Sequence, residues 1–189
     1  MFLVVMEKVK DKIYKISGES NVYFLNFDKK IIIDISCFEN RDLVKKELKG
    51  KLEQIEIVIF THLHYDHIGN WDLFKNAKFY ASSDEIKFFE KNPLGSVLNK
   101  EVLKNFKVKL LYLEELDLKS LGLKLISTPG HTVGSICLLY EDVLFSGDTL
   151  FEEGYGRLDL PSSKPAEMKK SLEILKKIKF KILCPGHDY

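Results

Sequence analysis

The chain has 189 residues, with 29 basic and 28 acidic side chains and a formal net charge of +1. Its 45% hydrophobic and 12% aromatic content excludes an intrinsically disordered chain, and its length predicts a single domain over residues 1–189. The balanced charge predicts neither a nucleic-acid partner nor a membrane partner.

The N-terminal residues MFLVVM form an apolar run shorter than the core of a secretory signal peptide, and charged residues follow at once. No stretch approaches the ~18 consecutive apolar residues that a membrane span needs. The three cysteines, Cys37, Cys137 and Cys184, are scattered and form no CxxC pair, which is typical of reduced thiols. Together these features predict a cytoplasmic protein.

The first half of the chain predicts strands and two helices. Residues 41–50 place leucine and valine at helical spacing and end in a glycine. The apolar run 55–60 suits a central strand that is buried on both faces, and a polar loop follows it at 61–70. Residues 82–92 predict a helix that Pro93 ends. The strands expected in this half are 12–16, 21–27, 30–35, 55–60 and 78–81.

The second half adds another group of strands. Residues 94–115 predict one more helix and a short strand, and residues 165–178 predict an amphipathic helix that begins at a proline. The other expected strands are 122–127, 135–140, 142–147 and 181–186. Two groups of strands with helices between them predict a layered α/β fold, in which two sheets have helices outside.

Three of the five histidines lie in one window of six residues, from His62 to His67. Residues two apart in an extended backbone point to the same side, so His62 and His64 can bind one metal ion together. Asp66 and His67 follow a bend and face a neighbouring position. Four ligand-type side chains in six residues are more than one tetrahedral ion needs, and they predict a two-metal site.

The other candidate ligands also follow strands directly. His131 and His187 each come after an expected strand and a Pro-Gly turn, and Asp148 follows the strand 142–147. Loops at strand ends can present such side chains to a common site. The combination of imidazole and carboxylate is typical of zinc sites.

The motifs THLHYDH, PGHTVGS, SGDTLF and CPGH, in this order, resemble the metallo-β-lactamase superfamily. The resemblance covers nearly the whole chain and implies a four-layered αββα sandwich with a binuclear site at one edge of the two sheets. The ligands that it implies are His62, His64 and His131 for the first ion, Asp66, His67 and His187 for the second, and Asp148 as a bridge between both.

Within this superfamily, GDTLFEEGYGRLDLP (147–161) resembles the glyoxalase II-like branch, that of hydroxyacylglutathione hydrolase, and the related persulfide dioxygenases. Arg157 lies in this pattern beside Asp159, and we expect a bidentate ion pair that holds the loop near Asp148. The resemblance also implies that Asp34 supports the metal-binding loop.

The resemblance implies two zinc ions per chain, with iron or manganese as alternatives. Two zinc ions would lower the pKa of a bridging water toward neutrality, and the hydroxide would attack the carbonyl of a small-molecule substrate. Asp66 would orient the hydroxide and accept its proton, so it is the candidate catalytic residue. A thiolate leaving group needs little help from a general acid, so we expect a thioester or another ester-like substrate.

The substrate groove is expected to come from the catalytic domain alone. The chain ends at Tyr189 without the helical region that helps glyoxalase II hold glutathione. We therefore expect residues 92–115 and 150–164 to form the groove, with Phe151 and Tyr155 available to line it.

The motifs leave other functions open. A persulfide dioxygenase would use one iron ion and molecular oxygen, and a lactonase would use the same hydrolytic site. An RNA-processing nuclease of the superfamily usually carries an inserted arm, for which the segment between His67 and His131 leaves little room. A non-catalytic binding module is disfavoured because every ligand position is kept. The oligomeric state has no signal in the sequence.

Overall fold

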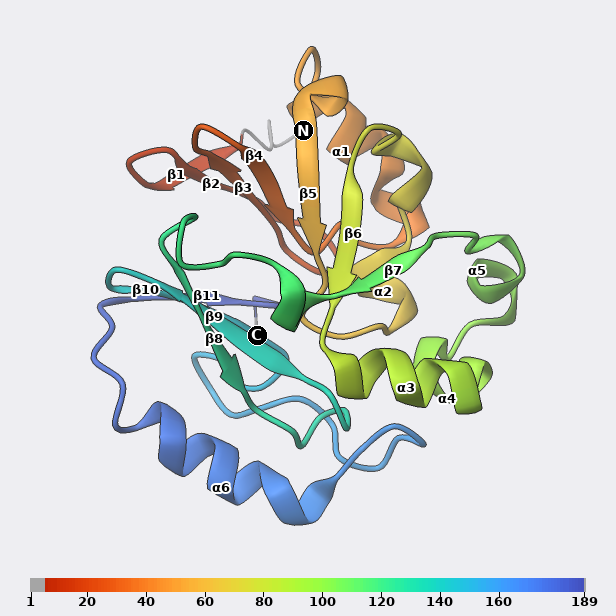
Figure 1. Ribbon diagram of the computed structural model, residues 1–189, viewed down its shortest axis with the longest axis vertical. Coiled ribbons are helices and arrows are strands. Elements are labelled where there is room, and N and C mark those ends of the chain that lie inside the picture. Colours follow the sequence, from red (N-terminus) through yellow and green to blue (C-terminus); the bar gives the residue numbers. More distant parts are fainter. Residues whose placement is uncertain (1–5, 189) are drawn as a thin grey trace.

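The computed structural model of the chain describes residues 6–188 and has two β-sheets lying face to face, with helices on the outer side of each (Figure 1). This arrangement confirms the expected four-layered αββα sandwich. The expectation for the N-terminal run falls mostly on residues 1–5, which lie outside the described part of the chain. No helix within residues 6–188 is long and apolar enough to cross a membrane.

The first sheet carries its strands in chain order. The pairs from β1 to β4 are antiparallel, and the pairs from β4 to β7 are parallel. The strands are β1 (Glu7–Lys10), β2 (Ile13–Ile16), β3 (Val22–Asn26), β4 (Lys30–Ile33), β5 (Ile55–Ile59), β6 (Lys78–Ala81) and β7 (Leu110–Tyr112).

The second sheet has the strand order β11-β10-β9-β8. Only the β10–β11 pair is parallel in this sheet, so β8, β10 and β11 all run in the same direction. The strands are β8 (Leu123–Ser127), β9 (Ile136–Tyr140), β10 (Val143–Gly147) and β11 (Ile182–Pro185).

The helices cover the two outer faces. Helices α1, α3, α4 and α5 accompany the first sheet, and α6 lies across the outer face of the second (Figure 1). The helices are α1 (Arg41–Glu47), α2 (Tyr65–Ile68), α3 (Ser83–Lys91), α4 (Pro93–Val97), α5 (Lys100–Asn105) and α6 (Pro165–Leu175). Short 3₁₀ turns are η1 (Phe38–Asn40), η2 (Leu52–Gln54), η3 (Trp71–Leu73) and η4 (Leu113–Glu115).

Several local elements differ from those expected. The loop expected at 61–70 contains the short helix α2, and β1 was not expected at all. Pro93 does not only end α3 but begins α4, because a residue without an N–H suits the first turn of a helix. The single helix expected within 94–115 is therefore two short helices, α4 and α5.

Alternation along the central strands explains why they are apolar without interruption. In β4, Ile31 and Ile33 face the core between the two sheets, whereas Ile32 faces the core under the helices of the first sheet. All three side chains are fully buried, as expected for strands covered on both faces. In β10, Phe145 faces the core between the sheets and Leu144 packs on the side of α6.

Hydrogen bonds join the two sheets at one edge. The Ile136 N–H donates to the Thr61 carbonyl at 3.1 Å, and the Asn21 N–H donates to the Gly186 carbonyl at 2.7 Å. The Tyr23 hydroxyl donates to the Pro185 carbonyl at 2.7 Å. These bonds hold the ends of β5 and β11 in fixed relation to the opposite sheet.

Candidate metal centre

The structure brings all seven predicted ligands together where strands of the two sheets end. Each ligand lies in the segment that follows one of these strands. His62 and His64 follow β5, Asp66 and His67 lie on α2, His131 follows β8, Asp148 follows β10 directly, and His187 follows β11.

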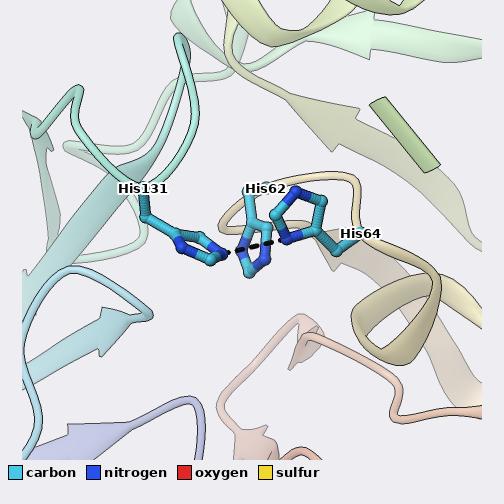
Figure 2. Close-up of side chains that lie close together, drawn as sticks. All are labelled: His62, His64 and His131. Carbon is cyan, nitrogen blue, oxygen red and sulfur yellow. Dashed lines mark hydrogen bonds between the residues drawn. The ribbon is translucent and has the colours of Figure 1, made fainter. Parts of the chain in front are cut away.

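His62, His64 and His131 form the first group of candidate ligands (Figure 2). One ligand atom from each lies within 4.8 Å of the others. Figure 2 shows the rings turned toward one another, with the contact of 2.9 Å between His131 Nε2 and His64 Nδ1 as a dashed line. His62 Nε2 is buried and has no hydrogen-bond partner among the described residues. Because a buried polar nitrogen without a partner is costly, this atom indicates a ligand position.

Asp66, His67 and His187 form the second group. The Nε2 atoms of His67 and His187 are 3.3 Å apart. The Asp66 Oδ2 atom lies 3.3 Å from His187 Nε2 and 3.8 Å from His67 Nε2. Two imidazole nitrogens and a carboxylate oxygen therefore converge on one point.

Asp148 lies between the two groups. Its Oδ1 atom is 3.3 Å from His67 Nε2, and its Oδ2 atom is 3.4 Å from His131 Nε2 and 3.5 Å from His187 Nε2. A Cβ atom at Gly186 would lie 2.1 Å from Asp148 Oδ1, so only glycine leaves room for the carboxylate there. The geometry places one carboxylate within reach of both ligand groups.

Asp34 and Thr61 orient two of the imidazoles through contacts on the side of each ring that faces away from the cluster. Asp34 accepts hydrogen bonds from the Thr61 N–H at 2.8 Å, the Thr61 hydroxyl at 2.7 Å and His67 Nδ1 at 2.9 Å. Because the Thr61 hydroxyl gives its proton to Asp34, it accepts from His62 Nδ1 at 3.1 Å. Both imidazoles thus carry their proton on Nδ1, and Nε2 faces the cluster.

Outer partners also orient the other three histidines. His131 Nδ1 donates to the Arg157 carbonyl at 2.8 Å, and His187 Nδ1 donates to the Glu19 carbonyl. His64 is reversed, since its Nε2 contacts the Ser162 hydroxyl at 2.9 Å and its Nδ1 faces the cluster. Each of the five rings thus directs one nitrogen inward and is held by an outer partner, as in metal sites.

Burial and charge divide the histidines into two kinds. Burial lowers the pKa of His62 well below its usual value and that of His64 to about 3, so both rings are neutral. Burial alone would also lower the pKa of His67, but nearby carboxylates, led by Asp148, raise it well above its usual value. For His187, burial is likewise outweighed by Asp148 and Asp66, and its pKa rises to about 9. The carboxylates of the site thus attract positive charge.

These observations test whether the cluster fits a metal. Imidazoles with inward nitrogens, buried carboxylates and an unpartnered nitrogen are what divalent transition-metal ions require. The burial of Asp148 would raise its pKa, but the surrounding histidines, His67 first, hold it well below its usual value. The carboxylate is therefore ionised, and the residues present fit metal ions.

The expected ion pair of Arg157 is present, but it does not hold the loop. Its Nε and Nη2 atoms each donate to Asp159 at 3.0 Å, and both side chains are 71% exposed. An exposed pair within one loop contributes little. The backbone makes the contact instead: the Gly156 N–H donates to the Asp148 carbonyl at 2.9 Å, and the Arg157 carbonyl accepts from His131.

A cavity of about 440 Å³ opens beside the metal ligands. Residues 150–164 supply much of its wall, including Phe151 and Tyr155, as expected, whereas 92–115 supplies only Leu98 among the described residues. Glu19 and Tyr65 also line it, and the sequence did not indicate either of them as a lining residue.

Asp34→Asn is expected to weaken metal binding by about 10- to 100-fold, the usual effect of losing a residue that orients a ligand. The amide cannot accept all three hydrogen bonds, whereas asparagine tolerates the backbone φ of +53° at this position. Competition between the protein and a chelating dye measures the affinity. The exposed Asp28→Asn is the matched control, and equal affinities for both variants would contradict the role of Asp34.

Comparisons with known proteins agree with this geometry. A sequence model of the family described as the metallo-beta-lactamase superfamily matches residues 17–187. A probable metallo-hydrolase of Methanocaldococcus jannaschii is 34% identical, over 93% of this chain and 92% of the relative. A probable polyketide biosynthesis zinc-dependent hydrolase of Bacillus subtilis is 31% identical, over 72% of this chain and 58% of the relative.

A hydroxyacylglutathione hydrolase of Bartonella quintana is 32% identical over 75% of this chain, which spans about half (52%) of that relative. This similarity supports the glyoxalase II-like branch. Among solved structures, a protein crystallised in a di-iron-bound form matches with a TM-score of 0.70 and 22% identity, over 100% of this chain and 93% of the other. That likeness concerns the fold alone.

Proposed function

Because the chain belongs to the metallo-beta-lactamase superfamily, we propose that it is a hydrolase that uses two zinc ions to cleave a thioester or another ester-like small molecule. The observation that carries this proposal is the position of Asp148, whose two oxygens lie within 3.5 Å of histidines from both ligand groups. A single mononuclear site would not need two groups joined by one carboxylate.

Zinc ions bound by this donor set would polarise a substrate carbonyl and lower the pKa of a coordinated water toward neutrality. The first ion would be held by His62, His64 and His131, and the second by Asp66, His67 and His187, with Asp148 shared between them. The choice of zinc is supported by the imidazole-rich donor set and by the zinc-dependent relative.

Asp66 is the candidate proton acceptor. Burial alone would raise its pKa, but His67 and His187 lower the pKa below its usual value, so the carboxylate is ionised. It also lines the cavity, in contrast to the fully buried His67 next to it. A carboxylate there can orient a water molecule toward a bound carbonyl and accept its proton.

The cavity suits a substrate with a good leaving group. Aromatic and aliphatic side chains, Tyr65, Phe151, Tyr155 and Leu98, line its wall and can hold an acyl or thiol portion. Among the described residues that line it, no lysine is present, and the guanidinium of Arg157 is paired with Asp159. A thiolate leaves without protonation, so a thioester fits a site with so few candidate acids.

The charges at the mouth of the cavity predict a preference among thioesters. Glu19 and Glu153 line the mouth, so an anionic leaving group such as glutathione meets like charge. Glu153→Lys is expected to raise kcat/KM for a glutathione thioester about three- to tenfold, because it replaces repulsion with attraction. The neighbouring Glu152→Lys is the control, since Glu152 does not line this cavity. A rise that is equal for an uncharged thioester would contradict this explanation.

The proposed function is tested by metal content together with a panel of thioesters, lactones, phosphodiesters and persulfides. We expect zinc in the purified protein and the highest kcat/KM on a thioester or another carboxylic ester. Oxygen uptake on a persulfide by protein that contains one iron ion per chain would contradict the proposal and indicate a persulfide dioxygenase. A phosphodiester as the best substrate would indicate a nuclease instead.

A further inference from the structure

Glu85 is a buried carboxylate on α3 that the proposed chemistry does not use. Its side chain is fully buried. Its Oε1 atom accepts a hydrogen bond from the Leu63 N–H at 3.1 Å. Its Oε2 atom accepts from the Thr132 hydroxyl at 2.7 Å and from the Gly134 N–H at 3.0 Å. One carboxylate thus joins two loops that are far apart in the sequence.

Both of these loops carry ligands of the first metal group. Leu63 lies between His62 and His64, and Thr132 follows His131 directly. These three histidines converge within 4.8 Å although their loops follow strands of different sheets. Among the described residues, Glu85 is the carboxylate that contacts both loops. It accepts from the backbone of Leu63 in the first loop and from the side chain of Thr132, next to His131, in the second.

The start of α3 lies directly against the second loop. The Ser82 hydroxyl donates to the Gly134 carbonyl at 2.6 Å and also accepts from the Glu85 N–H at 3.2 Å. A Cβ atom at Gly134 would lie 2.3 Å from the Glu85 nitrogen, so there is no room for a side chain between the loop and the helix. The helix therefore offers a rigid base on which the loop is fixed.

Helix capping does not account for the Glu85 side chain. Ser82 and Glu85 are spaced as in a capping box, in which the glutamate would accept a hydrogen bond from the backbone N–H of the capping residue. Here its oxygens accept instead from the two metal-binding loops. Burial raises the pKa of Glu85, and the hydrogen bonds from Thr132, Leu63 and Gly134 oppose that rise. Three donors around two oxygens match an ionised carboxylate.

We propose that Glu85 is a positioning residue that sets the separation of the two loops and thereby fits His62, His64 and His131 to one metal ion. This inference rests on the proposed metal-binding function and names a part of it that no ligand motif contains. The physical reason is that ligand atoms must keep their mutual distances within a few tenths of an ångström for a metal to bind tightly.

Glu85→Gln tests the inference with little change of shape. A glutamine amide presents one acceptor and one donor, so at least one of the three loop contacts loses its acceptor. We expect zinc affinity at the first site to fall about 10- to 100-fold and the visible absorption spectrum of the cobalt-substituted protein to change. Glu90→Gln, on the exposed side of the same helix, is the matched control and should match the wild type in both measurements.

A second pair of variants removes a single contact and leaves Glu85 in place. Thr132→Val lacks the hydroxyl that donates to Glu85, and Thr132→Ser retains it. We expect the valine variant to bind zinc more weakly and the serine variant to recover most of the affinity. Circular dichroism of the metal-free proteins checks that each variant is folded, so that a general loss of stability is distinguished from a loss of positioning.

The outcomes separate this inference from the proposed function. If wild-type protein binds zinc and the folded Glu85→Gln and Thr132→Val variants bind it equally well with an unchanged cobalt spectrum, the role of Glu85 is overturned and the proposed function stands. If wild-type protein binds no divalent metal, both are overturned. Weaker binding in both variants, with recovery in Thr132→Ser, supports the inference.

Discussion

Asp148→Asn is expected to lower kcat/KM by more than about a hundredfold, because it changes the carboxylate that we propose as a shared ligand. Even the loss of a residue that only orients a ligand costs about 10- to 100-fold in metal affinity. The amide keeps the size of the side chain but removes the charge that lies within 3.5 Å of His67, His131 and His187. Bound metal per chain is expected to fall with activity, and elemental analysis of the purified variant measures it.

The control for this variant lies at the other end of the strand that Asp148 follows. Asp142 precedes the opposite end of β10, where it pairs with Lys10 far from the ligands. Asp142→Asn should therefore keep the metal content and activity of the wild type. Full activity of Asp148→Asn with unchanged metal content would exclude a shared carboxylate ligand.

Removal of the metal by a chelator is expected to abolish hydrolysis and to lower Tm, with recovery of both on addition of zinc. Without metal, the converging carboxylates and imidazoles lose the positive ion that compensates the cost of their burial. Zinc at about 1,000 times its Kd stabilises the fold by about 4 kcal/mol, which in a chain of this size corresponds to about 8–16 °C in Tm.

The measurement needs the metal content of the treated sample. Activity that persists in protein shown to be metal-free would contradict the proposed chemistry. Recovery with iron but not with zinc would instead identify iron as the catalytic metal.

The fold and the ligand cluster could be predicted because both depend on patterns of neighbouring residues in the sequence. Apolar runs such as 55–60 mark strands buried on two faces, and the cluster from His62 to His67 follows one of them directly. Strands of a layered α/β fold that run in the same direction end at a common edge, so ligands that follow their ends are brought together. The short helix α2 was missed because it is about one turn long, and so short a segment shows no helical periodicity.

The residues that orient the ligands could not be predicted in the same way. Ser162 contacts His64 from 98 positions away, and Glu85 contacts Thr132 from 47 positions away. Contacts of such separation follow from how the layers pack and leave no local pattern. Glu85 is also masked by its spacing from Ser82, which is that of an ordinary helix cap.

We propose that two ligand groups, joined by Asp148, hold two metal ions. Elemental analysis of the purified wild-type chain beside His187→Ala tests it most directly, since His187 belongs to the second group alone. We expect about two zinc ions per wild-type chain and about one in the variant, with a folded protein in both cases. One metal ion per chain in both proteins, with equal activity, would contradict it.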